Sequence, residues 1–460
     1  MTLRRPFEVV DYQALMAQLP PPPQYFESVY LADPSAIAAR QLTGVKERAR
    51  RAAMVPFFER LWRAAGVGPD DIDTLDDLWR FPTYSVEDIR RSIERQPPWG
   101  DYQGVYPADA TTQPMRVYLS GGTTGKSRPT FYTQWDRDAG AIFTARLLWR
   151  SGVRPGDVVL NSYLYSTHNG AAMFDEALHR WMNCVVLTTS SGNVTATERQ
   201  VEMAVDYGAS AIVTTGDHLL RIADVAESMG YAIGRDLKLR AMPGAIGDAD
   251  KLEARFGLEM YHSYGFHEVN LVAVECPEHD GLHIFEDAYV VQVVDPETGE
   301  RLADGQLGSL VVTEFWKTGS PQFRYNTMDL SYLYPPGRCR CGSWMRRIGR
   351  FAGRGDNMVK LRGINIWPEA VGAVALAIPG VEADYFVRVR RVDERDEMTI
   401  AVVSALAGEQ RTTLAATIER ALQTRFGLKI AVDVTAPGGL DELTQFHTSP
   451  KPMRFRDERK

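Results

Sequence analysis

Short β-like runs alternate with helical stretches between residues 116 and 330, and this alternation constrains the fold more than any other feature of the sequence. The helical spacing appears in GAIFTARLLWRSGV and ERQVEMAVDYGA, and the strand-like runs are DVVLNSYLY, CVVLTTS, SAIVTTG and LKLRAMPG. Alternation of this kind predicts an α/β domain with a largely parallel sheet. From residue 284 to 316 the pattern changes to strands joined by turns such as DPETGE, so we expect additional sheets and a mixed architecture.

The two ends of the chain carry different patterns. Residues 36–66 predict a helical hairpin that stops at Gly66. From about residue 354 the order is strand, turn, strand, helix, two strands, helix and strand. We therefore predict a large N-terminal α/β domain with mixed sheets over residues 1–353 and a small C-terminal α+β domain over residues 354–460.

Composition excludes several classes of protein. The chain has 460 residues and a formal net charge of −7 without long runs of one sign, which argues against a nucleic-acid-binding protein. No apolar run reaches the roughly 18–20 residues of a transmembrane helix. The first residues, MTLRRPFEVVDYQ, lack the apolar core of a secretory signal. We expect a cytoplasmic protein with neither nucleic acid nor membrane as a partner.

The run LSGGTTGKSRPTFYT, residues 119–133, is rich in the Gly, Ser and Thr typical of phosphate-binding loops. It fails the P-loop pattern G-x-x-x-x-G-K-[ST], because Ser120 occupies the position of the first glycine. A P-loop also continues directly into a helix, whereas the four residues after Pro129 are strand formers. The sequence predicts a hairpin between two strands, which could wrap a phosphate chain with its N–H groups and hydroxyls. Taken alone, a hairpin without a ligand fits equally well.

Five motifs in order make the sequence resemble the adenylate-forming superfamily and, within it, the phenylacetate–CoA ligase-like branch. They are SGGTTGKS for the phosphate loop, YHSYGFHE (261–268), YNTMDL (325–330), the hinge region GRGDNMVKLRGINIWPEAV (353–371) and the C-terminal lysine motif SPKPMRFRDER (449–459). The resemblance spans roughly residues 40–460. Residues 57–90 and the run GLHIFED (281–287) favour this branch in particular.

The resemblance implies an ATP-dependent ligase. Such enzymes activate a carboxylic acid as an acyl-adenylate, release pyrophosphate and transfer the acyl group to CoA, with magnesium bridging phosphate oxygens. The ribose hydroxyls would contact Asp329, assisted by Arg354. By resemblance, the ATP-binding residues are Ser120, Gly121, Gly122, Thr123, Thr124, Gly125, Lys126, Gly244, Ala245, Tyr264, Gly265, Asp329 and Arg354.

The resemblance also implies three catalytic positions and a hinge. Glu268 would hold magnesium, and Lys451 would reach the α-phosphate from a mobile C-terminal domain. His267 stands where the family usually has a small hydroxyl residue, and could contact the α-phosphate or the acid. Asp356 occupies the hinge position, where a few residues absorb a domain rotation. Each residue alone would suit an ordinary turn or surface position, and the order of the motifs favours function.

The acyl pocket is expected in YLYSTHNGAA, residues 163–172, because it follows a strand where the branch places pocket residues. The polarity of His168 and His267 suits an acid with an amino- or hydroxy-substituted aromatic ring. A solvent loop is the alternative for this run. With His267 and Ile246 both departing from the family pattern, a biosynthetic specialist is favoured. The candidate acid-binding residues are Tyr165, His168, Asn169 and Gly170.

The cysteines predict a metal site. Cys276 opens CPEHDGLH, and Cys339 with Cys341 forms a C-x-C pair. Three cysteines and one histidine make a tetrahedral structural zinc site. We take His279 as the fourth ligand and leave His283 as the alternative. Free thiols would account for the same residues without zinc. The fourth cysteine of the chain, at position 184, is expected to lie buried in a strand.

The main prediction is an AMP-forming aryl-CoA ligase that uses ATP, magnesium, CoA and a small carboxylic acid, with structural zinc as an additional cofactor. One alternative passes the acyl group to an amine, a hydroxyl or the thiol of a carrier protein. Another transfers the adenylyl group itself. A non-catalytic nucleotide binder and a P-loop NTPase are weaker alternatives. Members of the family are often dimers, so a homodimer is a candidate assembly.

Overall fold

The computed structural model describes residues 4–120, 127–244, 247–357, 359–361, 364–382, 384–392, 395–445 and 452–459. The chain forms two compact units. The first consists of Met1–Thr327 with Tyr332–Arg350, and the second of Met328–Ser331 with Phe351–Lys460. No helix in the described ranges is long and apolar enough to cross a membrane.

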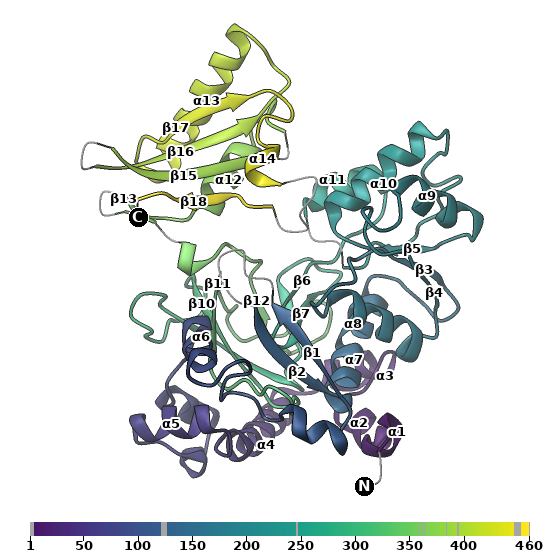
Figure 1. Ribbon diagram of the computed structural model, residues 1–460, viewed down its shortest axis with the longest axis vertical. Helices are drawn as coiled ribbons and strands as arrows, with labels where there is room; N and C mark the ends of the chain where they lie inside the picture. The colour runs from purple at the N-terminus through teal and green to yellow at the C-terminus, as the bar shows by residue number, and fades with distance from the viewer. Residues whose placement is uncertain are drawn as a thin grey trace. The chain divides into compact units, whose positions relative to one another are not determined.

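The first unit opens with helices (Figure 1). The expected hairpin is formed by α4 (Pro34–Ala52) and α5 (Pro56–Ala65), and Gly66 ends it with a φ of 67°. Their shared core contains Val45 of α4 and Trp62 of α5. The other N-terminal elements are α1 (Pro6–Val9), α2 (Tyr12–Gln18), α3 (Gln24–Glu27), η1 (Val29–Leu31), η2 (Pro69–Asp71), η3 (Leu75–Arg80), α6 (Val86–Arg95) and η4 (Pro107–Thr111).

The Gly/Ser/Thr-rich run joins two antiparallel strands, as predicted. These are β1 (Met115–Ser120) and β2 (Arg128–Thr133), whose register places Ser120 opposite Arg128. The helix α7 (Gln134–Arg150) begins only after β2, with Thr133 as its N-cap. Since no helix follows the loop directly, the strand–loop–helix arrangement of a P-loop NTPase is excluded.

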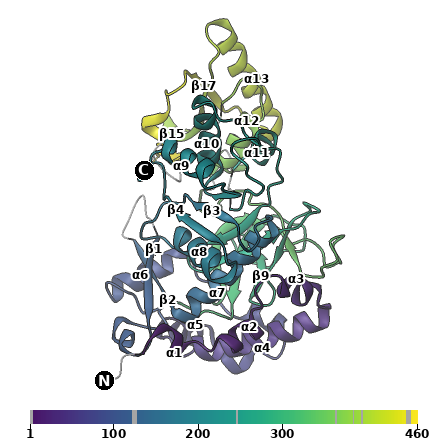
Figure 2. The ribbon, with the colours of Figure 1, turned by 90° about the vertical axis from the view of Figure 1, so that its right-hand side faces the viewer.

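A parallel sheet with strand order β4-β3-β5 follows, as the alternating pattern predicted. Its core joins Leu160 of β3 to residues of the α9–α11 helices, such as Ile222 and Leu252, and Figures 1 and 2 both show α9 and α10 beside this sheet. The run LKLRAMPG is no strand, because only isolated bridges at Leu237 and Ala241 form there. The elements are β3 (Val158–Asn161), α8 (Gly170–Glu176), η5 (Ala177–Trp181), β4 (Val185–Thr188), α9 (Thr197–Asp206), β5 (Ala211–Val213), α10 (Gly216–Ser228) and α11 (Ala249–Phe256).

Two further sheets confirm the mixed α/β fold class. Their strand orders are β12-β8-β7-β6 and β11-β10-β9. The strands are β6 (Ser263–Phe266), β7 (Asn270–Glu275), β8 (Leu282–Ile284), β9 (Tyr289–Val294), β10 (Gly308–Glu314), β11 (Tyr325–Ser331) and β12 (Arg347–Ile348).

The second unit is a small α+β structure built on a sheet of order β17-β16-β15-β18. Leu414, Ile418 and Leu422 on one face of α13 are buried in its core, and Figure 1 shows α13 lying along the sheet. The strand β18 and the helix α14 were not expected from sequence. The elements are η6 (Gly355–Asn357), β13 (Val359–Leu361), β14 (Ile364–Ile366), α12 (Pro368–Leu376), β15 (Tyr385–Val392), β16 (Arg395–Val403), α13 (Glu409–Phe426), β17 (Ala431–Thr435), α14 (Asp441–Thr444) and β18 (Phe455–Asp457).

Candidate functional site

The base of the β1–β2 hairpin is the first part of the candidate site. Ser120 ends β1 and is 7% exposed. Its Oγ is buried and has no hydrogen-bond partner among the described residues. The other predicted loop residues, Gly121–Lys126, lie outside the described residues. The hairpin therefore presents a buried, unused hydroxyl at the point where the chain enters the loop.

Glu268 lies beside this base. It follows β6 in sequence and is 6% exposed. Its Oε1 is 3.4 Å from Nη2 of Arg128, the residue opposite Ser120. The Nζ of Lys317 donates a hydrogen bond to the Glu268 carbonyl oxygen at 2.6 Å. The structure therefore brings the predicted magnesium-binding carboxylate to the phosphate-loop hairpin, 140 residues away in sequence.

His267 presents a neutral imidazole beside Glu268. Burial lowers the pKa of His267 to about 4, so the ring is uncharged near neutral pH. Its Nε2 is buried and has no hydrogen-bond partner among the described residues. The backbone carbonyl of His267 accepts hydrogen bonds from the Asn169 side chain at 3.2 Å and from the Tyr132 hydroxyl at 3.1 Å. These two contacts hold the segment against β2 and against the expected acid-binding loop.

The four residues predicted to bind the acid lie in different surroundings. Asn169 is 8% exposed and contacts the His267 backbone. Gly170 begins α8, and the His168 ring lies in ordinary contact range of the position that a Gly170 Cβ would take. Tyr165 instead donates a hydrogen bond to the Asp175 carboxylate at 3.0 Å and accepts one from Asn161 at 2.8 Å. A hydrogen bond thus joins Asn169 to the His267–Glu268 segment.

Gly244 contacts two aromatic residues, Tyr163 in the expected acid-binding run and Phe174 just after it. Its φ is +72°, and a Cβ there would lie 2.6 Å from Cζ of Phe174, so a side chain would meet both backbone strain and a clash. The Tyr163 hydroxyl donates to the Gly244 carbonyl oxygen at 2.6 Å, and its ring stacks on Phe174 at 5.2 Å between centroids. The neighbouring Ala245 and Ile246 lie outside the described residues.

Tyr264 and Gly265 occupy the strand β6 before the His267–Glu268 pair. The Tyr264 side chain is buried, and its hydroxyl donates to the Thr327 hydroxyl at 3.3 Å. Gly265 passes so close to the backbone of Asn270 that a Cβ would lie 2.3 Å from the Asn270 carbonyl oxygen. Only glycine fits there, so close packing explains the glycine of the YHSYGFHE motif.

Within the second unit, Asp329 and Arg354 form a pair. Arg354 Nη1 donates to Asp329 Oδ1 at 3.0 Å, and the two residues also share an isolated β-bridge. Asp329 is 8% exposed. The predicted hinge residue Asp356 lies in η6, and its side chain is outside the described residues, as is Lys451. The pairing of Asp329 with Arg354 places side by side the two residues expected at the ribose.

Lys317 and Arg128 were missed by the sequence interpretation, and Tyr163 lies in the predicted pocket run 163–172 without having been named as a candidate. Lys317 is fully buried, its Nζ lies 3.8 Å from the centre of the Tyr132 ring, and burial lowers its pKa to about 8. A lysine in FWKTGS carries no signal of burial. Arg128 could have been found from the sequence, because it immediately follows the phosphate-loop run.

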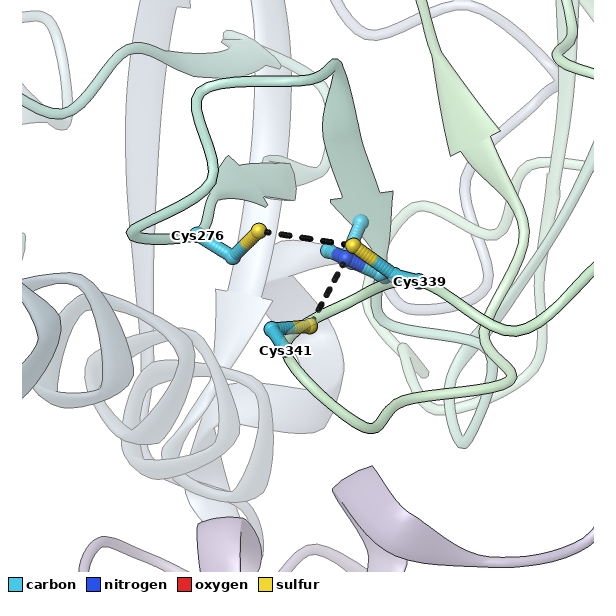
Figure 3. A group of neighbouring side chains, drawn as sticks. Cys276, Cys339 and Cys341 are labelled. Atoms are coloured by element: carbon cyan, nitrogen blue, oxygen red, sulfur yellow. Dashed lines mark hydrogen bonds between the residues drawn. The ribbon is translucent and has the colours of Figure 1, made fainter.

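A second cluster is a candidate metal centre. Its members are Cys276, His283, Cys339 and Cys341, whose ligand atoms all lie within 4.8 Å of one another. Figure 3 shows the three cysteine side chains turned toward one another. The sulfur atoms of Cys276 and Cys339 are 3.8 Å apart, and Cys341 Sγ is 3.4 Å from His283 Nε2. The two cysteine-bearing segments, distant in sequence, meet as the zinc prediction requires.

The histidine of this cluster differs from the one chosen from sequence. His279 lies in the turn after β7, where its Nδ1 is 3.2 Å from Glu275 Oε2 and its ring stacks on Tyr261. His283 lies on β8, which pairs with both β7 and β12 and so returns beside Cys276. The Nδ1 of His283 is 3.1 Å from the Met345 carbonyl oxygen, which leaves Nε2 for a metal.

Comparison with known proteins identifies the family. Residues 363–459 match the family described as AMP-binding enzyme C-terminal domain. The phenylacetate-coenzyme A ligase of Aromatoleum evansii is 32% identical over 438 residues, 92% of this chain and 96% of that protein. The chain belongs to the phenylacetate–CoA ligase family of adenylate-forming enzymes. It is 34% identical to the Pseudomonas putida phenylacetate-coenzyme A ligase over 84% of its length and 87% of that enzyme.

Solved structures give the same fold. A 2-hydroxyisobutyryl-CoA ligase in the postadenylation state, in complex with 2-HIB-AMP, superposes with a TM-score of 0.80 at 22% identity, covering 94% of this chain and 91% of that one. Family membership makes this protein an AMP-forming CoA ligase. It activates a carboxylic acid with ATP as an acyl-adenylate and transfers the acyl group to CoA.

Proposed function

We propose that this ligase forms its acyl-adenylate at the hairpin base beside Glu268, and that its acid is an aryl carboxylic acid bearing a hydroxyl or amino group. The observation that carries the proposal is a concentration of unused polar atoms. Ser120 Oγ, Arg128 Nε and His267 Nε2 are all buried without hydrogen-bond partners among the described residues. Because buried polar groups are almost always paired, these atoms are suited to a bound substrate.

The adenylation step brings two anions together, so the site must supply donors and positive charge. The Gly/Ser/Thr loop that begins at Ser120 would hold the β- and γ-phosphates. Glu268 would bind magnesium, which neutralises charge that develops on the phosphate oxygens. Asp329 would accept hydrogen bonds from the ribose hydroxyls, with Arg354 orienting its carboxylate. Lys451 would neutralise the α-phosphate, and rotation at Asp356 would withdraw it before CoA attacks.

The acid class follows from the chemistry of His267. The Tyr118 backbone accepts a hydrogen bond from the His267 ring, and Nε2 is the ring nitrogen without a partner, so we place the proton of the neutral ring on Nδ1. Nε2 can then accept a hydrogen bond, but it repels a phosphate oxygen that carries only lone pairs. A hydroxyl or amino group on the acid would supply the missing donor. The stacked rings of Tyr163 and Phe174 offer an apolar surface, which suits an aromatic ring.

The proposal is tested by acid-dependent exchange of labelled pyrophosphate into ATP. The acids would be phenylacetate, its hydroxy- and amino-substituted forms and aliphatic controls, with Lys451→Ala measured alongside. We expect exchange with the substituted aryl acids, loss of exchange in Lys451→Ala, and an acyl-CoA mass after CoA is added. Better exchange with unsubstituted phenylacetate would overturn the acid class. Exchange without acyl-CoA formation would favour an amine, a hydroxyl or a carrier thiol as acceptor.

We also propose that Cys276, His283, Cys339 and Cys341 hold a structural zinc ion. Three thiolates and one imidazole are the donor set of closed tetrahedral zinc sites. The four residues are buried or nearly so, which leaves little room for a substrate at the metal. The Tyr30 hydroxyl lies 3.1 Å from Cys341 Sγ and would donate to the thiolate. Metal analysis of purified protein, with one zinc per chain expected, tests the site independently of ligase activity.

A further inference from the structure

Arg128 has no role in the resemblance that led to the family, yet it lies at the centre of the candidate site. It is the first residue of β2 and faces Ser120 across the base of the phosphate-loop hairpin. Its side chain is 15% exposed, and that of Glu268 is 8% exposed. The guanidinium therefore sits in a largely dry position at the base of the phosphate-loop hairpin, beside the carboxylate that would carry the metal.

The contact between Arg128 and Glu268 uses few of the hydrogen-bond donors of the guanidinium. A guanidinium has five N–H donors. Nη2 approaches Glu268 Oε1 at 3.4 Å, which is long for a charge-assisted hydrogen bond. Nε is buried and has no partner among the described residues. Donors thus remain for a second anion next to the loop.

Separating Arg128 from Glu268 is energetically costly. Removing one partner of a buried ion pair leaves an uncompensated charge, which is strongly unfavourable. Arg128 therefore leaves Glu268 at least cost when another cation replaces it there and another anion receives its guanidinium. A complex of a divalent cation with a nucleoside triphosphate supplies both at once.

We propose that Arg128 exchanges partners: it neutralises Glu268 in the free enzyme and binds the β- and γ-phosphates once a divalent cation occupies Glu268. This inference rests on the proposed role of Glu268. In the reaction, an oxygen of the acid forms a bond to the α-phosphorus while the bond from the α-phosphorus to the bridging oxygen of pyrophosphate breaks. Arg128 faces the pyrophosphate, which leaves with the electron pair of that bond. Arg128 therefore balances the negative charge of Glu268 before the metal binds. Afterwards it balances the negative charge of the pyrophosphate leaving group.

The test is equilibrium binding of an ATP analogue with a methylene bridge between the α- and β-phosphates, measured by calorimetry without acid. Arg128→Gln is compared with wild type in magnesium and in EDTA. With magnesium we expect affinity to fall about 10- to 100-fold, the range for loss of a hydrogen bond to a charged group. In EDTA the loss is expected to be smaller, because Arg128 is then engaged with Glu268. Binding of AMP, which lacks both distal phosphates, is expected to stay within about twofold.

Two further variants sharpen the result. Arg128→Lys keeps the charge but not the fork of donors, so its affinity for the analogue is expected to lie between wild type and Arg128→Gln. Arg116→Gln is the matched control, because Arg116 lies on the same hairpin and is exposed. We expect it to bind the analogue as wild type does.

Three different outcomes would overturn the proposed exchange of partners. If Arg128 serves only as a counter-ion, Arg128→Gln binds the analogue normally in magnesium and needs less magnesium to do so, which overturns the exchange. An equal loss of AMP and analogue binding shows a general distortion of the site and also overturns it. Failure of wild type to bind the analogue under any condition contradicts the proposed ATP site itself, and the inference falls with it.

Discussion

His283 approaches Cys341 with Nε2 3.4 Å from Sγ, while the other ring nitrogen, Nδ1, lies 3.1 Å from the Met345 carbonyl oxygen. A metal-binding histidine is commonly oriented in this way, with the nitrogen that does not bind the metal donating to a carbonyl or carboxylate. His279, only four residues earlier, has its Nδ1 beside the Glu275 carboxylate instead. The two histidines therefore offer a matched pair for testing the metal site.

We predict that His283→Ala purifies with much less zinc than wild type, whereas His279→Ala retains one equivalent. The reason is that only His283 has a ring nitrogen among the clustered cysteine sulfurs. Metal content by mass spectrometry is the measurement, with the melting temperature recorded on the same samples. Since structural zinc contributes to folding free energy, the zinc-poor variant is expected to melt at a lower temperature.

Cys184→Ser is the control for loss of a cysteine, because Cys184 lies outside the cluster. It is expected to keep its zinc. The site would have to be abandoned if wild type carried no zinc after expression in zinc-supplemented medium. Loss of metal from His279→Ala but not from His283→Ala would reverse the choice of ligand.

From the sequence we took His279 as the fourth ligand and left His283 as the alternative, whereas the structure clusters His283 with the three cysteines, and the reason is tertiary. In CPEHDGLH both histidines fit a zinc motif by spacing. The decision lies in the pairing of β8 with β7 and β12, which brings His283 back toward the cysteines. The β1–β2 hairpin was predictable, because the residues after Pro129 favour a strand. The contact of Arg128 with Glu268 was not, because it joins residues 140 positions apart.

Glu268→Gln is predicted to lower the rate of acid-dependent pyrophosphate exchange by about 100- to 1000-fold, the usual cost of losing one electrostatic stabiliser of a transition state. The amide keeps the shape of the side chain but removes the charge that would bind magnesium. AMP affinity is expected to change little, because AMP does not need the metal. Exchange assays over a range of magnesium concentrations, with AMP binding alongside, provide the measurement.

Glu259→Gln supplies the control for this prediction, since Glu259 is exposed and belongs to the segment before β6. Its exchange rate should equal that of wild type. An unchanged rate in Glu268→Gln would remove Glu268 from the catalytic residues. An equal loss of AMP binding would indicate a structural effect.

Asp329→Asn is predicted to reduce the preference for ATP over 2′-deoxy-ATP. Wild type is expected to bind ATP about tenfold or more tightly, because a hydroxyl that donates to a charged acceptor is worth about 1.5–3 kcal/mol. The asparagine keeps an acceptor oxygen but loses the charge, so the ratio should fall severalfold. Competition binding against a fluorescent nucleotide measures the ratio directly, and Asp433→Asn, at an exposed position of β17, controls for the substitution. A ratio that stays at the wild-type value would show that Asp329 does not contact the ribose.

His267→Gln is predicted to change the pH dependence of stability. Burial lowers the pKa of His267 to about 4 in the folded protein, while an unfolded histidine titrates near 6.5. As pH falls through 6.5 the unfolded state takes up a proton that the folded state does not, so wild-type stability decreases between pH 6.5 and pH 4. Lowering the pH from 8 to 5 reduces the free energy of unfolding of wild type by about 2 kcal/mol through proton linkage at His267. Glutamine removes this penalty.

The measurement is urea unfolding of wild type and His267→Gln at pH 8 and pH 5. The free energy of unfolding of the variant, relative to wild type, should rise by about 2 kcal/mol at the lower pH. His179→Gln, at an exposed position, controls for introducing glutamine. The outcome bears on the substrate as well as on stability, because the proposed hydrogen bond from the acid requires an uncharged Nε2. If the relative stability is the same at both pH values, His267 titrates normally, and the argument for an acid that donates a hydrogen bond to it loses its basis.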